Sequence, residues 1–243
     1  MAFERVNVER IVGNCSAETG PCATVSVQAP VVEMASHDAK IRVNSYIVNQ
    51  VKETFASVAN VDVEPIIQQS AQELADSFFA HYEAFTQEFP DSPQRWSVDI
   101  KGDVLGNAYS VVTYKMHRET YTGGAHPNHE THYATFNAAN GKKLKIGEIV
   151  RDTANLNNIA EPYFREAVDI AKDLPLMESG FSFDQNKFQV PNNFGMVQEG
   201  IIFHYNPYEI APYAAGEISF LVPYDALGGA KGIKVTRKKV KTN

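Results

Sequence analysis

The chain has 243 residues, of which 44% are hydrophobic and 21% charged, and its formal net charge is −7. This composition fits one large or two modest globular domains with a sizeable core. It argues against a nucleic-acid groove, which needs clustered Lys and Arg, and no apolar run approaches the ~18 to 20 residues that cross a bilayer. We therefore expect no nucleic-acid partner, and membrane attachment only through an absent leader or anchor. If the protein is exported, we expect its leader to have been replaced by Met1.

Residues 6–12 and 23–32 predict two strands that flank a loop containing Cys15 and Cys22. The loop is rich in turn-forming residues, so a disulfide would tie the ends of a hairpin and contribute about 2.5 kcal/mol by the loop-entropy estimate. Such a bond indicates an oxidising compartment, the periplasm or the cell surface. Two unpaired thiols are the alternative. Cys15 lacks the preceding apolar segment of a lipidated cysteine.

Two amphipathic helices are predicted next. Hydrophobic residues at three- and four-residue spacing predict a helix over 38–59, with Ser36 or Asp38 as its N-cap. A second helix is expected to begin at Glu64 and Pro65 and to end before Pro90. Its buried face is expected to consist of Ile67, Ala71, Leu74, Phe78, Tyr82, Phe85 and Phe89.

Residues 96–137 alternate mostly with a period of two and predict an antiparallel sheet with one wet face, with a hairpin turn over 137–141. A third helix is expected over 156–170, then apolar segments near Phe188 and over 201–205, and a strand over 218–222. Strands mixed with about three long helices, without regular βαβ alternation, predict an α+β fold with antiparallel or mixed sheets.

Two segments far apart in the sequence, 121–128 (YTGGAHPN) and 208–216 (YEIAPYAAG), place aromatic hydroxyls beside Gly and Pro. Gly and Pro suit fixed turns and poorly suit regular helix or strand. Both segments are therefore predicted to shape a surface.

In the second segment, Pro207 and Pro212 would stiffen a corner that leads to Gly216 and presents Tyr208, Glu209 and Tyr213. Rigid tyrosines lose little entropy on binding and often anchor interfaces, so these residues could bind a partner. The alternative is that the rings pack on the sheet while their hydroxyls cap backbone groups.

In the first segment the backbone can turn at Gly123 and Gly124, and Pro127 stiffens the residues around it. The imidazole of His126 could then hydrogen-bond neighbouring carbonyls and pin the loop. Contact of His126 and Asn128 with a partner is a second role for this segment.

Three imidazoles and a carboxylate, from His126, His129, Glu130 and His132, lie within seven positions and could bind zinc in a metal-dependent hydrolase. The spacing differs from the His-Glu-x-x-His pattern of zincins, since Tyr133 stands where the second His would be. The sequence has no nucleophile elbow, P-loop or dinucleotide fingerprint. We identify no catalytic residue, expect no cofactor or metal, and keep the hydrolase as the alternative.

Together with 140–142 (NGK) and 222–224 (VPY), the two tyrosine-bearing segments resemble a bacterial extracytoplasmic family of largely unknown function. Its better-known members include RsiV-type anti-sigma factor ectodomains, which sense lysozyme, and the non-catalytic part of PdaC-type peptidoglycan deacetylases. The resemblance implies a non-enzymatic binding or sensing domain of the cell envelope. Its expected partner is a basic protein such as lysozyme, which the negative net charge would favour, or a peptidoglycan fragment.

The resemblance also implies a division of the chain. Residues 1–120 would form an N-terminal α+β module and residues 121–229 a C-terminal one, packed closely because no linker separates them. Residues 230–243 would form a basic tail, and the protein would lie in the periplasm or at the cell surface.

Overall fold

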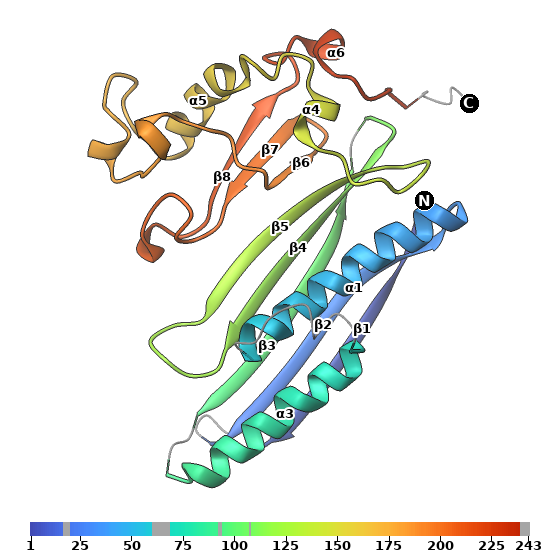
Figure 1. Cartoon of the computed structure of the whole chain (residues 1–243), viewed down its shortest axis with the longest axis vertical. Coiled ribbons are helices and arrows are strands. Elements are labelled where there is room, and N and C mark those ends of the chain that lie inside the picture. Colours follow the sequence, from blue (N-terminus) through green and yellow to red (C-terminus); the bar gives the residue numbers. More distant parts are fainter. Residues whose placement is uncertain (17–19, 60–68, 92–93, 107, 239–243) are drawn as a thin grey trace. The chain divides into compact units, whose positions relative to one another are not determined.

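The computed structural model describes residues 1–16, 20–59, 69–91, 94–106 and 108–238 (Figure 1). The chain forms two units, one made of Met1–Gly102 with Met116–His129 and the other of Asp103–Lys115 with Glu130–Asn243. The predicted module boundary after residue 120 and the close packing of the two modules stay predictions. None of the described helices is long and apolar enough to cross a membrane.

The first unit begins with a long hairpin. Strand β1 (Ala2–Gly13) pairs antiparallel with β2 (Cys22–Met34), and Asn7 lies opposite Gln28. Both predicted strands are confirmed, and each is longer than expected. The predicted disulfide between Cys15 and Cys22 is also confirmed, with their Cα atoms 5.1 Å apart.

Gly13 explains how the hairpin closes beside this disulfide. Its φ is +85°, and a Cβ atom there would lie 2.4 Å from the carbonyl oxygen of Pro21. A side chain would therefore both strain the backbone and collide with the returning strand.

Strand β2 pairs in parallel with β3 (Arg95–Leu105), so Cys22 lies opposite Arg95. With β4 (Val111–Tyr121) and β5 (Asn128–Asn137), these strands form a five-stranded sheet in the order β1-β2-β3-β4-β5. The sheet is therefore mixed, as the predicted fold class allows.

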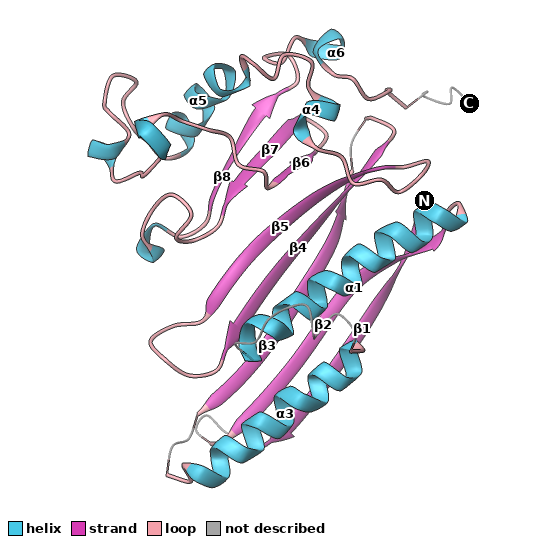
Figure 2. Ribbon diagram, viewed as in Figure 1, coloured by secondary structure: helices cyan, strands magenta, loops and turns pink. Residues whose placement is uncertain are grey.

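Helices α1 (His37–Ala59) and α3 (Ala71–Glu88) lie on one face of β1 and β2 (Figure 2). The predicted period of α1 is confirmed, because Val43, Ile47 and Phe55 are buried. Asn44 also ties α1 to β2: its side chain accepts from Val32 N at 2.8 Å and donates to Val32 O at 3.1 Å.

The second predicted helix begins later than expected. The expected start at Glu64 and Pro65 lies outside the described residues, and α3 begins behind Ser70, which forms a reciprocal capping box with Glu73. Of the expected buried face, Leu74, Phe78 and Tyr82 are buried, Phe85 is half-buried, and Ile67 is not described. Ala71 and Phe89 are exposed, because they lie at the first turn and beyond the last residue of α3.

The second unit holds a smaller antiparallel sheet, β6-β7-β8. Its strands are β6 (Phe194–Met196), β7 (Gly200–Tyr205) and β8 (Ile218–Pro223). Its helices are α4 (Ile146–Ile149), α5 (Leu156–Ala167) and α6 (Gly229–Gly232), with 3-10 turns over Met177–Ser179, Asp184–Asn186 and Tyr213–Ala215.

The predicted turn over 137–141 is confirmed: Gly141 has φ +69° and its N–H donates to Asn137 O at 2.8 Å.

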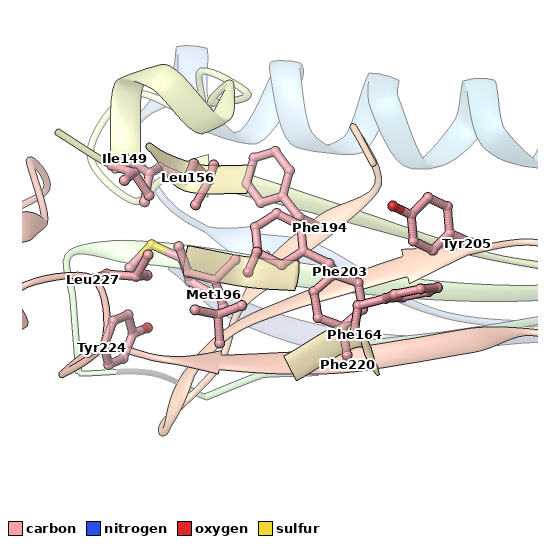
Figure 3. Packing of buried hydrophobic residues seen from close by; sticks show 14 of the residues in the cluster. Ile149, Leu156, Phe164, Phe194, Met196, Phe203, Tyr205, Phe220, Tyr224 and Leu227 are labelled. Atoms are coloured by element: carbon pink, nitrogen blue, oxygen red, sulfur yellow. The ribbon is translucent and has the colours of Figure 1, made fainter. Parts of the chain in front are cut away.

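The core of the second unit contains a group of aromatic side chains packed among aliphatic ones (Figure 3). Phe164 of α5 is fully buried, and its ring centroid lies 5.1 Å from that of Phe188 and 5.7 Å from that of Phe220 on β8. The described part of the C-terminal segment joins this unit, since Ile233 is buried and bridges Val150. With three helices of 12 to 23 residues and two sheets, the described residues confirm the α+β class.

Candidate ligand-binding site

The turn between β7 and β8 presents a pair of tyrosines. We call residues 206–217 the Tyr208 corner. Tyr208 is 66% exposed and has φ +69°, a left-handed conformation that is rare for a residue with a bulky side chain. Its ring centroid lies 5.6 Å from that of Tyr213, at an interplanar angle of 36°. The corner therefore holds two neighbouring rings where solvent can reach them.

The backbone of the corner is fixed by its own hydrogen bonds and by one buried anchor. Gly216 N donates to Tyr213 O at 2.9 Å, and Glu209 N donates to Asn206 O at 3.2 Å. Ile210 is buried, and its carbonyl accepts from Ser182 N at 2.8 Å. The two tyrosines are thus carried by a turn that is attached to the rest of its unit.

A polar network lies beneath the corner and centres on Asn206, which is 6% exposed. Asn206 Oδ1 accepts from Thr131 N of β5 at 2.7 Å, and His204 Nε2 lies 3.2 Å away. The Thr131 hydroxyl donates to Glu217 Oε1 at 3.0 Å. The network joins both ends of the corner to β5, so the position of the corner depends on several buried polar groups.

His204 is buried on β7 and is held in one tautomer. Because Asn206 Oδ1 can only accept, His204 Nε2 carries the proton, and Nδ1 accepts from Ser219 Oγ at 2.6 Å. Burial lowers the pKa of His204, while the nearby Glu217 carboxylate, 3.9 Å away, acts in the opposite direction. The ring is accordingly neutral at neutral pH.

Asn193 forms a second polar link to the same strand. Its Oδ1 accepts from Tyr133 N at 2.7 Å, and its Nδ2 donates to Thr131 O at 2.6 Å. Together with Asn206, it satisfies backbone groups along β5 with side-chain amides. Two asparagines therefore take the place of a pairing strand at these residues.

A pocket of about 440 Å³ lies beside the corner. Its buried lining includes the aromatic rings of Phe183 and Tyr205, and its exposed polar lining includes Asp184, Gln189, Asn192 and Glu209. Although the residue as a whole is exposed, partial desolvation of its carboxyl group raises the pKa of Glu209, and hydrogen bonds from Asn206 act in the opposite direction. Aromatic surface with acids and amides around it suits a polar ligand that has hydroxyl groups and some apolar surface.

The first tyrosine-bearing segment belongs to the other unit, and its last residue is the first of β5. Gly123 and Gly124 have φ values of +97° and +108°, and the Tyr121 hydroxyl donates to Gly124 O at 2.9 Å. His126 is half-buried, and its Nδ1 lies 3.0 Å from Pro127 O. Tyr121 thus makes a hydrogen bond across the turn, and His126 lies within hydrogen-bond distance of a neighbouring carbonyl, as the sequence led us to expect.

The other predicted site residues lie at the ends of these turns. Asn128 is exposed at the first position of β5, Pro127 precedes it, and Pro212 precedes the 3-10 turn at Tyr213. The structure brings Tyr208, Glu209 and Tyr213 together within the corner. It describes the Gly123 loop in a different unit, so the expected shared surface stays a prediction.

The residues of the alternative metal site do not gather. His132 Nε2 lies 2.9 Å from Glu130 Oε2, and the His129 ring lies 6.4 Å from that of His117. Among the described residues, no group of three or more His, Cys, Asp or Glu side chains is placed to hold a metal ion. The site geometry therefore gives no support to a metal-dependent hydrolase.

Two family models match different parts of the chain. Residues 148–225 match DUF3298, a family of proteins of unknown function. Residues 16–129 match the family described as Deacetylase PdaC. The family resemblance predicted from the sequence is confirmed.

Solved structures of the DUF3298 family are similar over nearly the whole chain. A family member from Bacteroides fragilis is 18% identical and has a TM-score of 0.66, with 93% of this chain and 92% of that chain covered. A family protein from Pseudomonas aeruginosa is 17% identical and has a TM-score of 0.63, with 98% and 97% covered. At these identities the likeness shows the fold alone. Among curated proteins, none matches this chain in sequence.

The DUF3298 match contains the whole Tyr208 corner and its partners Asn193 and His204, whereas the Gly123 loop lies in the PdaC match. Thr131 lies between the two matches. The network therefore joins the DUF3298 segment to a strand outside it.

Sequence reasoning missed most of the residues that hold the corner: Thr131, Asn193, His204, Asn206 and Glu217. One signal was available. His204 interrupts the apolar strand β7 and Asn206 directly follows it, and a polar side chain at a core position must find a hydrogen-bond partner. Which partner it finds depends on residues as far away as Thr131, and local pattern does not show this.

Proposed function

We propose that this protein is a non-enzymatic, extracytoplasmic binding domain of the cell envelope, and that the Tyr208 corner with its adjacent pocket recognises peptidoglycan fragments. The conformation of Tyr208 carries the proposal. A left-handed backbone costs a residue with a side chain roughly 1 to 2 kcal/mol, and Gly or Asn would lower that cost. Here the residue is instead a tyrosine whose ring is mostly exposed. Exposing a large ring at a strained position fits a role in recognition.

The surroundings of Tyr208 support a glycan ligand. Sugar rings have apolar faces that pack on tyrosine, and their hydroxyls bond to carboxylates and amides, which the corner and pocket supply through Glu209, Asp184 and Asn192. A pocket of about 440 Å³ is also within the usual range for small ligands.

The disulfide and the family match support a location outside the cytoplasm. The Cys15–Cys22 disulfide fits an oxidising compartment. The PdaC match and the resemblance to the non-catalytic part of peptidoglycan deacetylases favour the cell envelope.

A second candidate partner is a basic protein such as a lysozyme-like muramidase. The net charge of −7 and the exposed Glu209 beside Tyr208 favour it, because opposite charges speed the encounter of two proteins. The two candidates are distinguished by testing soluble muropeptides and lysozyme separately.

The test is isothermal titration with the purified chain and its Tyr208→Gly variant. Glycine keeps the left-handed backbone and removes the ring, so we expect the variant to stay folded and to bind at least about tenfold more weakly. The matched control is Asp169→Gly, which changes another exposed left-handed residue of the same unit away from the corner. Its affinity should equal that of the wild type.

Each outcome bears on the proposal. Binding of muropeptides that Tyr208→Gly weakens supports it. Binding of lysozyme alone, weakened in the same way, replaces the glycan with the basic protein. If neither ligand binds, or if both variants bind as the wild type does, the proposed function is wrong.

A further inference from the structure

Strand β1 leaves one edge of the large sheet open within the described part of the chain. It stands first in the strand order and pairs with β2 along its other side, as Figure 1 shows. Six consecutive residues of β1, 4–9, are exposed. An edge strand of this length presents backbone N–H and C=O groups that can pair with a further strand.

The sequence of this edge is self-complementary about Asn7. Residues 3–11 read FERVNVERI, so an antiparallel copy centred on Asn7 would place each acidic residue opposite a basic one and each apolar residue opposite another. The facing pairs would be Phe3 with Ile11, Glu4 with Arg10, Arg5 with Glu9, Val6 with Val8, and Asn7 with Asn7. Opposite charges and apolar side chains that face each other directly stabilise a strand pair.

We propose that β1 pairs antiparallel with β1 of a second copy of this chain, with Asn7 opposite Asn7 on a twofold axis, and forms a homodimer through a continuous sheet.

The charge pattern selects this register and this orientation. A shift of two residues in one direction places Arg5 opposite Asn7 and Glu4 opposite Val8, and a shift in the other places Val6 opposite Arg10. Parallel pairing in register would set Glu4 against Glu4 and Arg5 against Arg5, which is unfavourable. Charged residues on an edge strand usually prevent pairing, but here they become complementary only when the partner is a second copy related by twofold symmetry.

The side of β1 that faces the helices adds an apolar contribution. Val6 and Val8 line an apolar groove of about 210 Å³ between β1, α1 and α3, and they are 38% and 43% exposed. In the proposed dimer Val6 of one copy faces Val8 of the other on the same side of the sheet, so the two grooves adjoin and these valines lose solvent contact. The second copy thus covers apolar surface that one copy leaves open.

Arg10 is already positioned at the end of this groove. Its Nη1 donates to Asp76 Oδ1 at 2.6 Å, and its guanidinium lies 4.9 Å from the centroid of the Phe79 ring. A guanidinium has five N–H donors, so Arg10 can keep this contact and also meet Glu4 of the second copy. The intrachain bond fixes the side chain before association, which reduces the entropy lost on pairing.

The first test is sedimentation of the untagged chain between about 1 and 100 μM, a range that brackets moderate affinities. We expect a shift from 26.9 kDa to twice that mass. Arg5→Glu alone and Glu9→Arg alone each create two like-charge pairs per dimer and should raise the dissociation constant at least about tenfold. The double variant Arg5→Glu with Glu9→Arg restores opposite charges and should return to within about threefold of the wild type.

The control for charge is Arg42→Glu on α1, which makes the same change in net charge at an exposed helix side chain that is not part of the edge strand. It should leave the dissociation constant unchanged, and thermal unfolding should show that all variants are folded. A chain that stays monomeric throughout overturns the proposal, as does a dimer that the single reversals do not weaken.

The second test fixes the register. Facing Cα atoms in an antiparallel pair lie about 4.5 to 5.5 Å apart, so Asn7→Cys should form a disulfide between copies under mild oxidation. Arg5→Cys is the matched control, because its two copies would lie about 14 Å apart along the strand, four residues at about 3.4 Å each. Cross-linking of Arg5→Cys without cross-linking of Asn7→Cys would exclude the Asn7-centred register.

Discussion

The side chain of Asn206 accepts a hydrogen bond from the backbone of Thr131, 75 residues earlier in the chain, at 2.7 Å. The same asparagine also bonds to the carboxylate of Glu209 in the exposed turn after it. One buried amide thus connects β5 to the residue that flanks the tyrosine pair. Disturbing it should affect both the stability of the unit and the position of the corner.

Asn206→Ala should therefore destabilise the protein. The substitution leaves the Thr131 N–H and the His204 Nε2–H without their buried acceptor, which should lower the free energy of unfolding by about 2 to 4 kcal/mol. Urea unfolding at neutral pH measures this. The exposed Asn192→Ala is the control and should change stability by less than about 0.5 kcal/mol. Equal losses in the two variants would contradict the central role of Asn206.

Tyr208→Gly should make the protein slightly more stable. The substitution removes the strain of a left-handed tyrosine, although glycine adds freedom to the unfolded chain, so we expect a net gain of up to about 1 kcal/mol. Thermal unfolding of Tyr208→Gly and Tyr208→Ala compares the two, because alanine keeps the strain. A Tyr208→Gly variant that is no more stable than Tyr208→Ala would show that the left-handed backbone carries no strain, and one that is less stable than the wild type would show that the ring supports the fold.

His204 should make stability depend on pH. Its pKa is lowered in the folded state, so the unfolded chain binds the proton more readily, and stability falls as the pH drops through the unfolded value of about 6.5. The slope for one group is at most about 1.4 kcal/mol per pH unit.

The measurement is urea unfolding at pH 7.5 and 5.5, for the wild type and for His204→Gln. The raised pKa of Glu209 acts in the opposite direction as the pH falls, since the folded state binds the proton of this carboxyl more readily, and this group is present in both proteins. The difference in slope between the proteins therefore reports on His204. Identical slopes would mean that this ring does not titrate in the window.

Removing the disulfide should lower stability. The Cys15→Ser and Cys22→Ser double variant should lose about 2.5 kcal/mol, because the unfolded chain regains the freedom of a short loop. Wild-type protein unfolded in the presence of a reductant should show the same loss. A double variant as stable as the oxidised wild type would show that the bond constrains little.

Periodicity is sufficient to predict most of the elements. The four-residue spacing of Val43, Ile47 and Val51 predicts α1, because a helix buries one stripe whatever it packs against. The start of α3 differs from the predicted one although its signal is local: Ser70 precedes Glu73 by three residues, the spacing of a capping box. Pro65 suits a first helical turn equally well, and the two signals compete within a few residues.

Local sequence periodicity does not reveal how the strands pair or which residues form the polar network beneath the Tyr208 corner. Whether β2 lies parallel to β3 depends on the path of the chain between them, and local alternation is the same for either direction. Tyr208 and Tyr213 stand out by their neighbours in sequence, whereas Asn193 and Asn206 matter through contacts with β5 about 60 or more residues away.

The two asparagines that occupy backbone groups of Thr131 and Tyr133 have a consequence for assembly. Because the backbone groups of β5 at those positions are already hydrogen-bonded to side chains, a strand of a second chain can add to the described sheet more readily beside β1. Pairing through β1 alone uses up the available sheet edge of both chains. The protein should therefore form dimers and not filaments, even at high concentration.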